Sequence, residues 1–249
     1  MGTGQTAPSA STPRRGGRPS SAGLGGRPVP VTLAAGTGMR TGDTAVMSAH
    51  VRVAVVGAGF GGIAAARLLA DGVDSLVVLE RADAIGGVWR DNVYPGAACD
   101  VESNLYELAA APNGDWSRRF APQPEIQAYL ERTADTLGVT PHLRLGTTVE
   151  QAAWDADALH WRIETDREPW SADVLVAAPG GLAEPRVPDL PGLGTFEGET
   201  MHTSRWRDDV ALDGKRVGVV GTGASAAQVV PAVQRVAREL VLFQRTAHW

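Results

Sequence analysis

This chain of 249 residues has one cysteine, Cys99, and one lysine, Lys215. A single cysteine excludes a disulfide framework and a CxxC redox pair, and with them an oxidoreductase of the thioredoxin-reductase kind. No run of about 18 apolar residues occurs, so the sequence predicts no transmembrane helix. The net charge of −5 offers no basic footprint for nucleic acid, and the five histidines lack metal-ligand spacing. These absences favour a soluble, cytoplasmic protein without a metal site.

Residues 1–46 differ in composition from the rest of the chain. Gly, Pro, Ser and Thr dominate this stretch, and it contains no aromatic residue. Because such a segment buries too little apolar surface to offset its conformational entropy, we expect a disordered leader. Its Arg and Ser content leaves a targeting peptide as an alternative, although no amphipathic period supports one. Met47 stands directly before the first expected strand and is an alternative start of the protein.

The first chemical signal lies between two expected strands. The run His50–Gly57 is apolar and β-branched, as in a buried parallel strand, and Ser75–Glu80 is a second such run. Between them, Gly57-x-Gly59-x-x-Gly62 opens a helix that ends before Gly72. This pattern is typical of a dinucleotide-binding turn, in which the helix N-terminus faces a pyrophosphate. Glu80 ends the second strand, where a carboxylate can hold ribose hydroxyls.

The same pattern returns near the end of the chain. Gly221-x-Gly223-x-x-Ala226 follows an apolar run and opens another expected helix. Glu80 stands 23 residues after Gly57, and the same spacing from Gly221 reaches Gln244, which Arg245 follows (221 + 23 = 244). Replacing a carboxylate by a guanidinium suits a cofactor with a 2′-phosphate, although a surface arginine at a strand end is the alternative. We therefore predict FAD at the first turn and NADPH at the second.

These signals predict an α/β protein with two Rossmann-like dinucleotide-binding units, of which the second is truncated. We expect the FAD-binding part at 47–192, a linker at 193–213, and the start of an NADPH-binding domain at 214–249. Trp154 and Trp161 flank an insert that looks like a β-hairpin.

The linker carries a more specific pattern. Phe196-x-Gly198-x-x-x-His202-x-x-x-Trp206 resembles the fingerprint of the type I Baeyer–Villiger monooxygenases, which are class B flavoprotein monooxygenases. Family members place Pro or Asp after the tryptophan, whereas Arg207 stands here. The stretches 86–103, 121–135 and 174–192 also resemble family segments. The last reads Ala178-Pro179-Gly180 where the family has Ala-Thr-Gly, and proline there removes a backbone N–H.

The resemblance implies contacts to both cofactors, residue by residue. Those implied around FAD are Gly57, Gly59, Phe60, Gly62, Glu80, Gly87, Val88, Trp89, Asp100, Tyr106 and Val149. Those implied around NADPH are Ala97, Ala98, Cys99, Gly221, Thr222, Gly223, Ala224, Ser225, Ala226, Gln244 and Arg245. We expect Cys99 to be a small buried residue without a redox role.

Two residues are candidates for the catalytic machinery. The resemblance matches Asp100 to an aspartate that orients an active-site arginine, so a buried carboxylate paired with an arginine is expected there. The alternative is a helix N-cap formed by Asp100 ahead of Ser103. For His202 we expect a coupling of domain position to cofactor state, and not a general base; a structural hydrogen bond is the alternative.

The resemblance implies an enzyme that uses NADPH and O2, through a C4a-peroxyflavin, to convert a small-molecule ketone into an ester or lactone. Family members continue for about as many residues again, so we expect this chain to be an N-terminal fragment. An alternative is therefore a catalytically incompetent piece that at most binds FAD. A second alternative is an N- or S-oxidising flavin monooxygenase, which would share both glycine turns but lack the pattern from His202 to Trp206.

Overall fold

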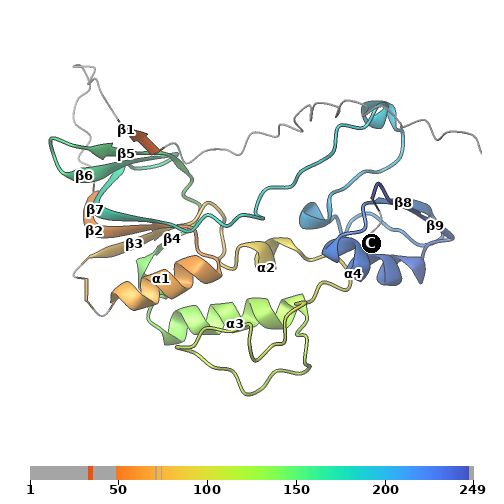
Figure 1. Cartoon of the computed structure of the whole chain (residues 1–249), viewed down its shortest axis with the longest axis horizontal. Coiled ribbons are helices and arrows are strands. Elements are labelled where there is room, and N and C mark those ends of the chain that lie inside the picture. The colour runs from red at the N-terminus through yellow and green to blue at the C-terminus, as the bar shows by residue number, and fades with distance from the viewer. Residues whose placement is uncertain (1–32, 36–48, 71, 74, 247–249) are drawn as a thin grey trace, which may run out of the picture.

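The structure is a computed structural model that describes residues 33–35, 49–70, 72, 73 and 75–246 (Figure 1). Its strands form a seven-stranded sheet, in the order β1-β5-β6-β7-β2-β3-β4, and a separate two-stranded sheet of β8 and β9. The strands are β1 (Leu33–Ala35), β2 (Ala49–Val56), β3 (Leu76–Leu79), β4 (Leu143–Arg144), β5 (Val149–Asp155), β6 (His160–Thr165), β7 (Trp170–Ala177), β8 (Arg216–Val220) and β9 (Glu239–Phe243). The helices are α1 (Phe60–Ala70), α2 (Val88–Asp91), α3 (Gln123–Thr136) and α4 (Ala224–Gln234), with 3-10 turns η1 (Thr140–His142), η2 (Leu193–Thr195) and η3 (Thr203–Arg205).

The first predicted β-α-β unit is confirmed as β2, α1 and β3. β2 pairs in parallel with β3 on one side and with β7 on the other, which places it in the middle of the sheet. All four residues of β3 are buried, as expected of a strand covered on both faces.

Alternate residues of the central strands pack on opposite faces of the sheet. On one face Val53, Val55 and Val78 pack with Ile63 of α1 and Leu130 of α3. On the other face the core consists of Ala54, Val77, Leu79, Ala152, Ile163, Trp170 and Ala172, from β2, β3, β5, β6 and β7. Val51, near the start of β2, also packs in this second cluster and departs from the alternation. Figure 1 shows the two helices on one side of the sheet and β5 and β6 on the other.

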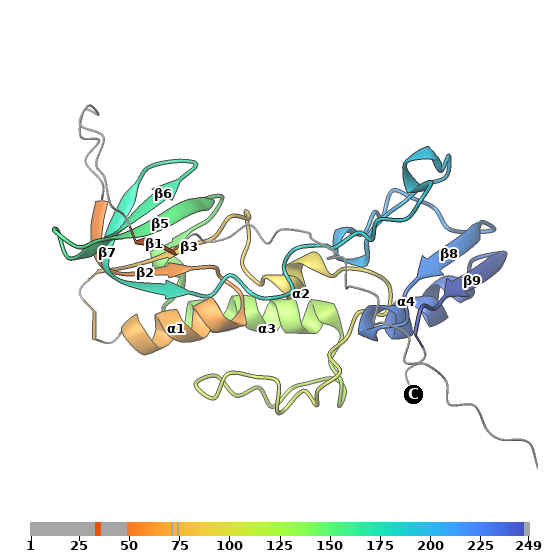
Figure 2. The ribbon, with the colours of Figure 1, turned by 45° about the horizontal axis from the view of Figure 1, so that its top comes forward.

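The expected hairpin is confirmed as the antiparallel pair β5 and β6. Trp154 faces Trp161 across the pair, with ring centroids 5.7 Å apart in an edge-to-face arrangement. Figure 2 shows these strands curling over the parallel part of the sheet, which covers its second face without a helix.

The leader prediction was wrong for one short stretch. Leu33–Ala35 form β1, which pairs in parallel with Ala152–Trp154 of β5. The reason is physical: without β1, β5 would be the edge strand of the sheet with unpaired main-chain groups, and this stretch belongs to the most apolar run of the leader. The rest of the leader, 1–32 and 36–46, lies outside the described residues.

The second predicted β-α-β unit is confirmed as β8, α4 and β9. Val217 and Leu240, from the two parallel strands, pack against Val229 and Val233 of α4. Figure 1 shows this unit at the far end of the molecule, joined to β7 by a long connection. In the described part of the chain, no helix is long and apolar enough to cross a membrane.

Candidate functional site

The first glycine turn has the tight geometry that the sequence predicts. Gly57 has φ +99° and donates its N–H to the carbonyl of Leu79 at 2.8 Å. A Cβ on Gly62 would lie 1.8 Å from the Gly57 carbonyl oxygen, so any side chain there would push the helix off the turn. A Cβ on Gly57 would lie 2.4 Å from the carbonyl oxygen of Ala178. Ala178 therefore packs on this turn, and Pro179, which stands where the family has threonine, follows it directly.

Glu80 is held beside the same turn. Its side chain is 7% exposed, and one carboxylate oxygen accepts a hydrogen bond from the N–H of Ala58 at 2.8 Å. The other oxygen accepts from the N–H of Ala82 at 3.0 Å and from Nη1 of Arg90 at 3.2 Å. Because a carboxylate has about four acceptor positions, one stays open for a ligand hydroxyl.

The stretch 86–103, which resembles the flavin-site segment of the family and is called the flavin segment below, reaches the first glycine turn. Gly86 donates its N–H to the carbonyl of Ala58 at 2.9 Å, and a Cβ on Gly87 would lie 3.3 Å from Cα of Gly59. Gly86 and Gly87 have φ +116° and +56°, so glycine suits both positions. Val88 begins α2 directly after this contact.

Three predicted aromatic site residues form one cluster. Nε1 of Trp89 donates to the hydroxyl of Tyr106 at 3.0 Å, and the rings of Phe60 and Tyr106 meet edge to face at 4.8 Å. They pack on buried Cys99 and Ile126. Burial, as the largest cause, raises the pKa of the Tyr106 hydroxyl and that of the Cys99 thiol. Both groups are therefore neutral at neutral pH, and Cys99 is a packed thiol.

Asp100 sits at the edge of this cluster, on the surface. Its side chain is exposed and forms no ion pair with the described arginines. The expectation of a buried carboxylate therefore does not match this structure, because the residue follows Cys99 out of the core. The capping alternative is not formed either, since the N–H of Ser103 is donated to the carbonyl of Arg119 at 2.7 Å. The orienting role of Asp100 stays a prediction.

Val149 lies two residues after Thr147, whose main chain is hydrogen-bonded to Glu80. The N–H of Glu80 donates to the main-chain carbonyl of Arg144 at 3.0 Å, and the N–H of Thr147 donates to the carbonyl of Glu80 at 2.8 Å. Val149 follows two residues later as the first residue of β5. A backbone contact of Val149 with FAD, near the Glu80 carboxylate that is expected to hold the ribose, stays a prediction.

The second glycine turn is open toward its surroundings. Gly221 has φ +107°, and Gly223 precedes Ala224, the first residue of α4. A Cβ on either glycine would meet no atom of the described residues within 4 Å, so the main chain can be approached closely there. Thr222, Ser225 and Ala226 complete the turn. Gln244 and Arg245 are exposed after β9, and Gln244 donates to the carbonyl of Thr246 at 3.1 Å.

The fingerprint segment, residues 196–206, contacts both units through Arg205 and Trp206. Nδ1 of His202 accepts from the N–H of Ser204 at 3.2 Å, which caps η3. Burial first, and the cation of Arg205 second, lower the pKa of His202. Arg205 faces Asp91 of α2 at 3.7 Å, and Trp206 packs on the buried cluster that contains Val229 and Val233 of α4.

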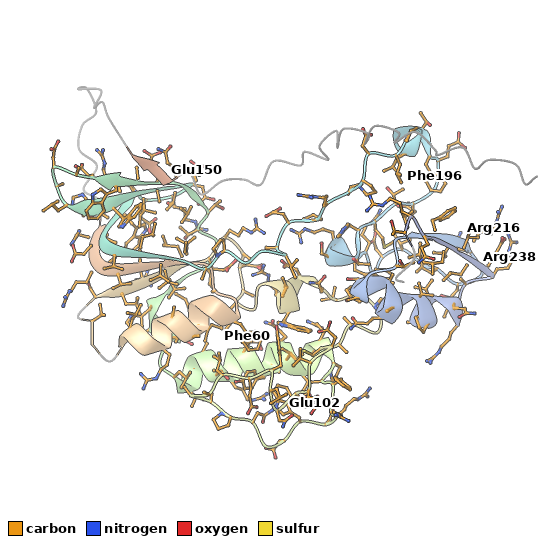
Figure 3. All side chains as sticks on the ribbon, viewed as in Figure 1. Phe60, Glu102, Glu150, Phe196, Arg216 and Arg238 are labelled. Carbon is orange, nitrogen blue, oxygen red and sulfur yellow. The ribbon has the colours of Figure 1, made fainter. Side chains whose placement is uncertain are left out.

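The first residue of the fingerprint lies elsewhere. Phe196 is exposed at the far end of the connection, well away from Phe60 (Figure 3). Arg207, the departure from the fingerprint, pairs with Glu199 and Asp209.

One residue at the contact between α4 and the flavin segment, which is the junction of the two units, was not predicted from the sequence. Gln228 of α4 donates Nε2–H to the carbonyl of Ala98 at 2.8 Å, and its Oε1 accepts from the hydroxyl of Tyr94 at 2.8 Å. Its partners are 130 and 134 residues away in sequence, and no motif marks the position. The fingerprint of the second turn ends at Ala226, two residues before Gln228.

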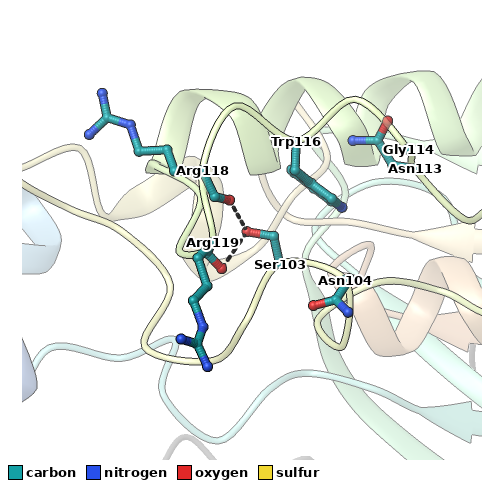
Figure 4. A pocket seen from close by; sticks show the side chains of 7 residues that line it. All are labelled: Ser103, Asn104, Asn113, Gly114, Trp116, Arg118 and Arg119. Atoms are coloured by element: carbon teal, nitrogen blue, oxygen red, sulfur yellow. Dashed lines mark hydrogen bonds between the residues drawn. The ribbon is translucent and has the colours of Figure 1, made fainter.

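Two hollows lie near these elements. One, of about 320 Å³, runs along the flavin segment and is lined by Val93, Tyr94, Pro95, Gly96, Ala97, Ala98, Arg118, Pro122, Gln123 and Pro124. The other, of about 340 Å³, is shown in Figure 4, where the Ser103 hydroxyl bonds to the carbonyls of Arg118 and Arg119. Only the first is lined by residues predicted to bind a cofactor, Ala97 and Ala98.

Comparison with known proteins agrees with this geometry. The profile of the flavin-binding monooxygenase-like family matches residues 50–249, and the chain belongs to that family. Among its relatives, a Baeyer–Villiger monooxygenase of Streptomyces coelicolor is 55% identical over 201 residues, which are 80% of this chain and 39% of that protein.

Solved structures show the same fold. A crystal structure described as OTEMO in complex with FAD and NADP has a TM-score of 0.75 and 37% identity, covering 81% of this chain and 40% of that one. Cyclohexanone monooxygenase from Rhodococcus sp. Phi1, bound to NADP+, has a TM-score of 0.74 and 41% identity, covering 81% of this chain and 39% of that one. The chain thus spans about 40% of the length of these relatives.

Proposed function

We propose that this chain is the dinucleotide-binding part of an FAD- and NADPH-dependent monooxygenase of the Baeyer–Villiger type. In the overall reaction a ketone, O2, NADPH and a proton give an ester or lactone, water and NADP+. The observation that supports this best is the meeting of three elements. The flavin segment touches the first glycine turn at Gly59, and Asp91 of its helix faces Arg205 of the fingerprint segment.

The residues fit FAD at the first site. Gly59 and Gly87 face each other with no side chain between them, so a pyrophosphate can come close to the main chain. Glu80 keeps an acceptor position for the ribose. FAD, when bound, would accept hydride from NADPH and supply the chemistry that activates O2. Phe60, Trp89 and Tyr106 form an apolar cluster that limits the access of water.

The second site suits NADPH. The open main chain at Gly221 and Gly223 leads into the N-terminus of α4, whose free N–H groups attract phosphate. Arg245 supplies a cation for the 2′-phosphate. Gln244 stands where the first unit has Glu80, so no carboxylate repels that phosphate. Along the chain, we assign 47–192 to the FAD-binding part, 193–213 to the linker and 214–249 to the NADPH-binding part.

The fingerprint segment favours ketone oxygenation over N- or S-oxidation. Glycine turns of both kinds serve many flavin enzymes, whereas η3 and its cap at His202 are built from the fingerprint itself. A substrate panel of cyclic ketones, sulfides and amines distinguishes the two classes. Oxidation of amines and sulfides without any ester from the ketones would contradict the Baeyer–Villiger assignment.

The direct test uses the full 249-residue chain, purified and mixed with FAD. We expect a visible flavin spectrum that survives gel filtration, bleaching by NADPH under anaerobic conditions, and ester from ketone in air. Absence of bound flavin would contradict the cofactor assignment. Flavin that NADPH bleaches without any ester would identify the chain as a dinucleotide-binding module, and the proposed oxygenation would be wrong for it.

Glu80→Gln provides a matched variant for the cofactor site. The neutral amide cannot accept from Ala58, Ala82 and Arg90 together, and it meets the ribose with a weaker bond. Since hydrogen bonds to a charged group contribute about 1.5–3 kcal/mol, the Kd for FAD should rise about 10- to 100-fold in a fluorescence titration. Glu150→Gln, on the exposed side of β5, is the control and should bind FAD like the parent chain.

A further inference from the structure

The junction between the two dinucleotide-binding units depends on one side chain. Residues 97–99 run as an extended stretch, and alternate main-chain groups point in opposite directions. Toward the start of α3, the carbonyl of Ala97 accepts from Gln123 and the N–H of Cys99 is donated to Ala121, both at 2.9 Å. The main chain of Ala98 points the other way, toward α4.

Gln228 satisfies both groups of Ala98. Its Nε2–H is donated to the Ala98 carbonyl at 2.8 Å, and its Oε1 accepts from the Ala98 N–H at 3.4 Å. The hydroxyl of Tyr94, in a residue only 7% exposed, donates to the same oxygen at 2.8 Å. A primary amide presents a donor and an acceptor side by side, as a peptide group does. Gln228 therefore pairs with Ala98 much as one residue of a neighbouring strand would.

A second, independent contact closes the same junction. Gly96 has φ +85°, and a Cβ there would lie 2.6 Å from the main-chain carbonyl oxygen of Gln228. The flavin segment thus touches the backbone of α4 directly at a position that only glycine tolerates. Tyr94 and Ala97 also pack with Val229 and Val233 in one buried cluster. Both views of the ribbon show the chain after α2 running to α4 (Figures 1 and 2).

We propose that Gln228 is a positioning residue that fixes the NADPH-binding turn relative to the flavin segment. It lies two residues beyond the predicted phosphate-binding turn 221–226, in the helix that this turn opens. Its side chain is hydrogen-bonded to Ala98, which is predicted to contact the nicotinamide end of NADPH. A dinucleotide held at the N-terminus of α4 is thereby directed at the flavin. This inference rests on the proposed function, because it assumes that both cofactors bind.

Two variants test the proposal, with Gln234→Glu as control. Gln228→Glu keeps the size of the side chain but replaces the donor facing the Ala98 carbonyl by an oxygen, so the pairing becomes repulsive. Gly96→Ala disturbs the same junction from the other side. Gln234 is exposed at the end of α4, and its change to Glu leaves the junction intact.

The first measurement needs no cofactor. Hydrogen–deuterium exchange of the full chain should show faster exchange of peptides over 94–99 and 224–234 in both variants, and not in Gln234→Glu. Unchanged exchange in Gln228→Glu and Gly96→Ala would contradict the docking role.

The second measurement separates positioning from binding. At saturating NADPH, we expect flavin reduction in stopped-flow to slow at least 10-fold in both variants, while the Kd values for FAD and NADP+ change less than 3-fold. Normal reduction rates despite faster exchange would overturn the positioning role. A parent chain that binds no flavin would instead refute the proposed function and positioning with it, while exchange still decides whether Gln228 docks the units.

Discussion

Gly62 has no room for a side chain, because the carbonyl oxygen of Gly57 occupies the place of its Cβ at 1.8 Å. Gly62→Ala should therefore lower the free energy of unfolding by more than about 2 kcal/mol and abolish FAD binding, as overpacking against main chain does. Chemical denaturation followed by circular dichroism measures this.

The neighbouring Gly61→Ala is the matched control. A Cβ at Gly61 would meet only the Cβ of Ala178 at 3.7 Å, which is an ordinary contact. Within α1, alanine should stabilise the chain by up to about 1 kcal/mol relative to glycine. Equal losses in the two variants would show that the close approach at Gly62 is not what the turn requires.

His202 makes the fingerprint segment sensitive to pH. Its Nδ1 accepts from Ser204, so a proton on that nitrogen removes the cap of η3. The folded-state pKa is lowered from 6.5 by burial and by the Arg205 cation. As the pH falls below about 6.5, the unfolded chain takes up a proton that the folded chain resists, and stability is lost; above 6.5 the residue contributes no pH dependence.

The test is limited trypsin digestion at Arg205 and Arg207 at pH 7.5 and at pH 5.5. These pH values lie about one unit above and below the pKa of free histidine, about 6.5. Because trypsin itself is slower at pH 5.5, cleavage at these two sites is measured relative to cleavage at exposed Arg186, and we expect this ratio to rise at the lower pH in the parent chain. His202→Asn keeps a capping side chain without a titrating group, so it should lose most of this difference. A pH effect of the same size in that variant would place the sensitive group elsewhere.

At the scale of elements, the two β-α-β units were predictable because their signals are local. Buried runs such as Leu76–Leu79, and glycine turns at their ends, depend on residues close in sequence. β1 was not predictable, because its pairing uses the unpaired edge of β5, over 100 residues further along the chain. The junction at Gln228 escaped prediction for the same reason.

The site residues that could be predicted are likewise those whose positions depend on local sequence spacing. The turn at Gly57 and the position of Glu80 follow from a spacing that the fold imposes. The exposure of Asp100 does not follow from any pattern, since Cys99 next to it is only 4% exposed. Whether such a residue faces the core or solvent is decided by the path of an irregular loop.

α4 contains a proline in its interior. Pro231 is exposed and cannot donate a hydrogen bond to the carbonyl of Ala227. Pro231→Ala should restore this bond and raise the free energy of unfolding by about 1–3 kcal/mol. Thermal unfolding measures the gain, with Ala227→Gly as the opposing control on the same turn. A lower melting temperature for Pro231→Ala would mean that the ring itself supports the helix.

At the scale of the whole molecule, the smaller sheet leaves one apolar face exposed. Val220, Val241 and Phe243 lie on the side of β8 and β9 that faces away from α4, and they are 59%, 40% and 54% exposed. Adjacent exposed apolar side chains of this kind favour association.

Val241→Lys should therefore reduce the binding of a hydrophobic dye and the concentration-dependent self-association of the chain, with an unchanged circular dichroism spectrum. Leu182→Lys is the control, because Leu182 is 82% exposed in the long connection, away from this face. Equal effects of the two substitutions on dye fluorescence and sedimentation would contradict the assignment.

The long connection itself has a further consequence. From Gly180 to Gly192 most residues are exposed, whereas the contact between the two units is made by Gln228, Tyr94 and their buried neighbours. Covalent continuity is thus not what aligns the units. A chain cut at Gly181 would carry one half of the contact on each piece. The two pieces would form a complementation pair, in which reassembly of the junction is read out as recovered flavin chemistry.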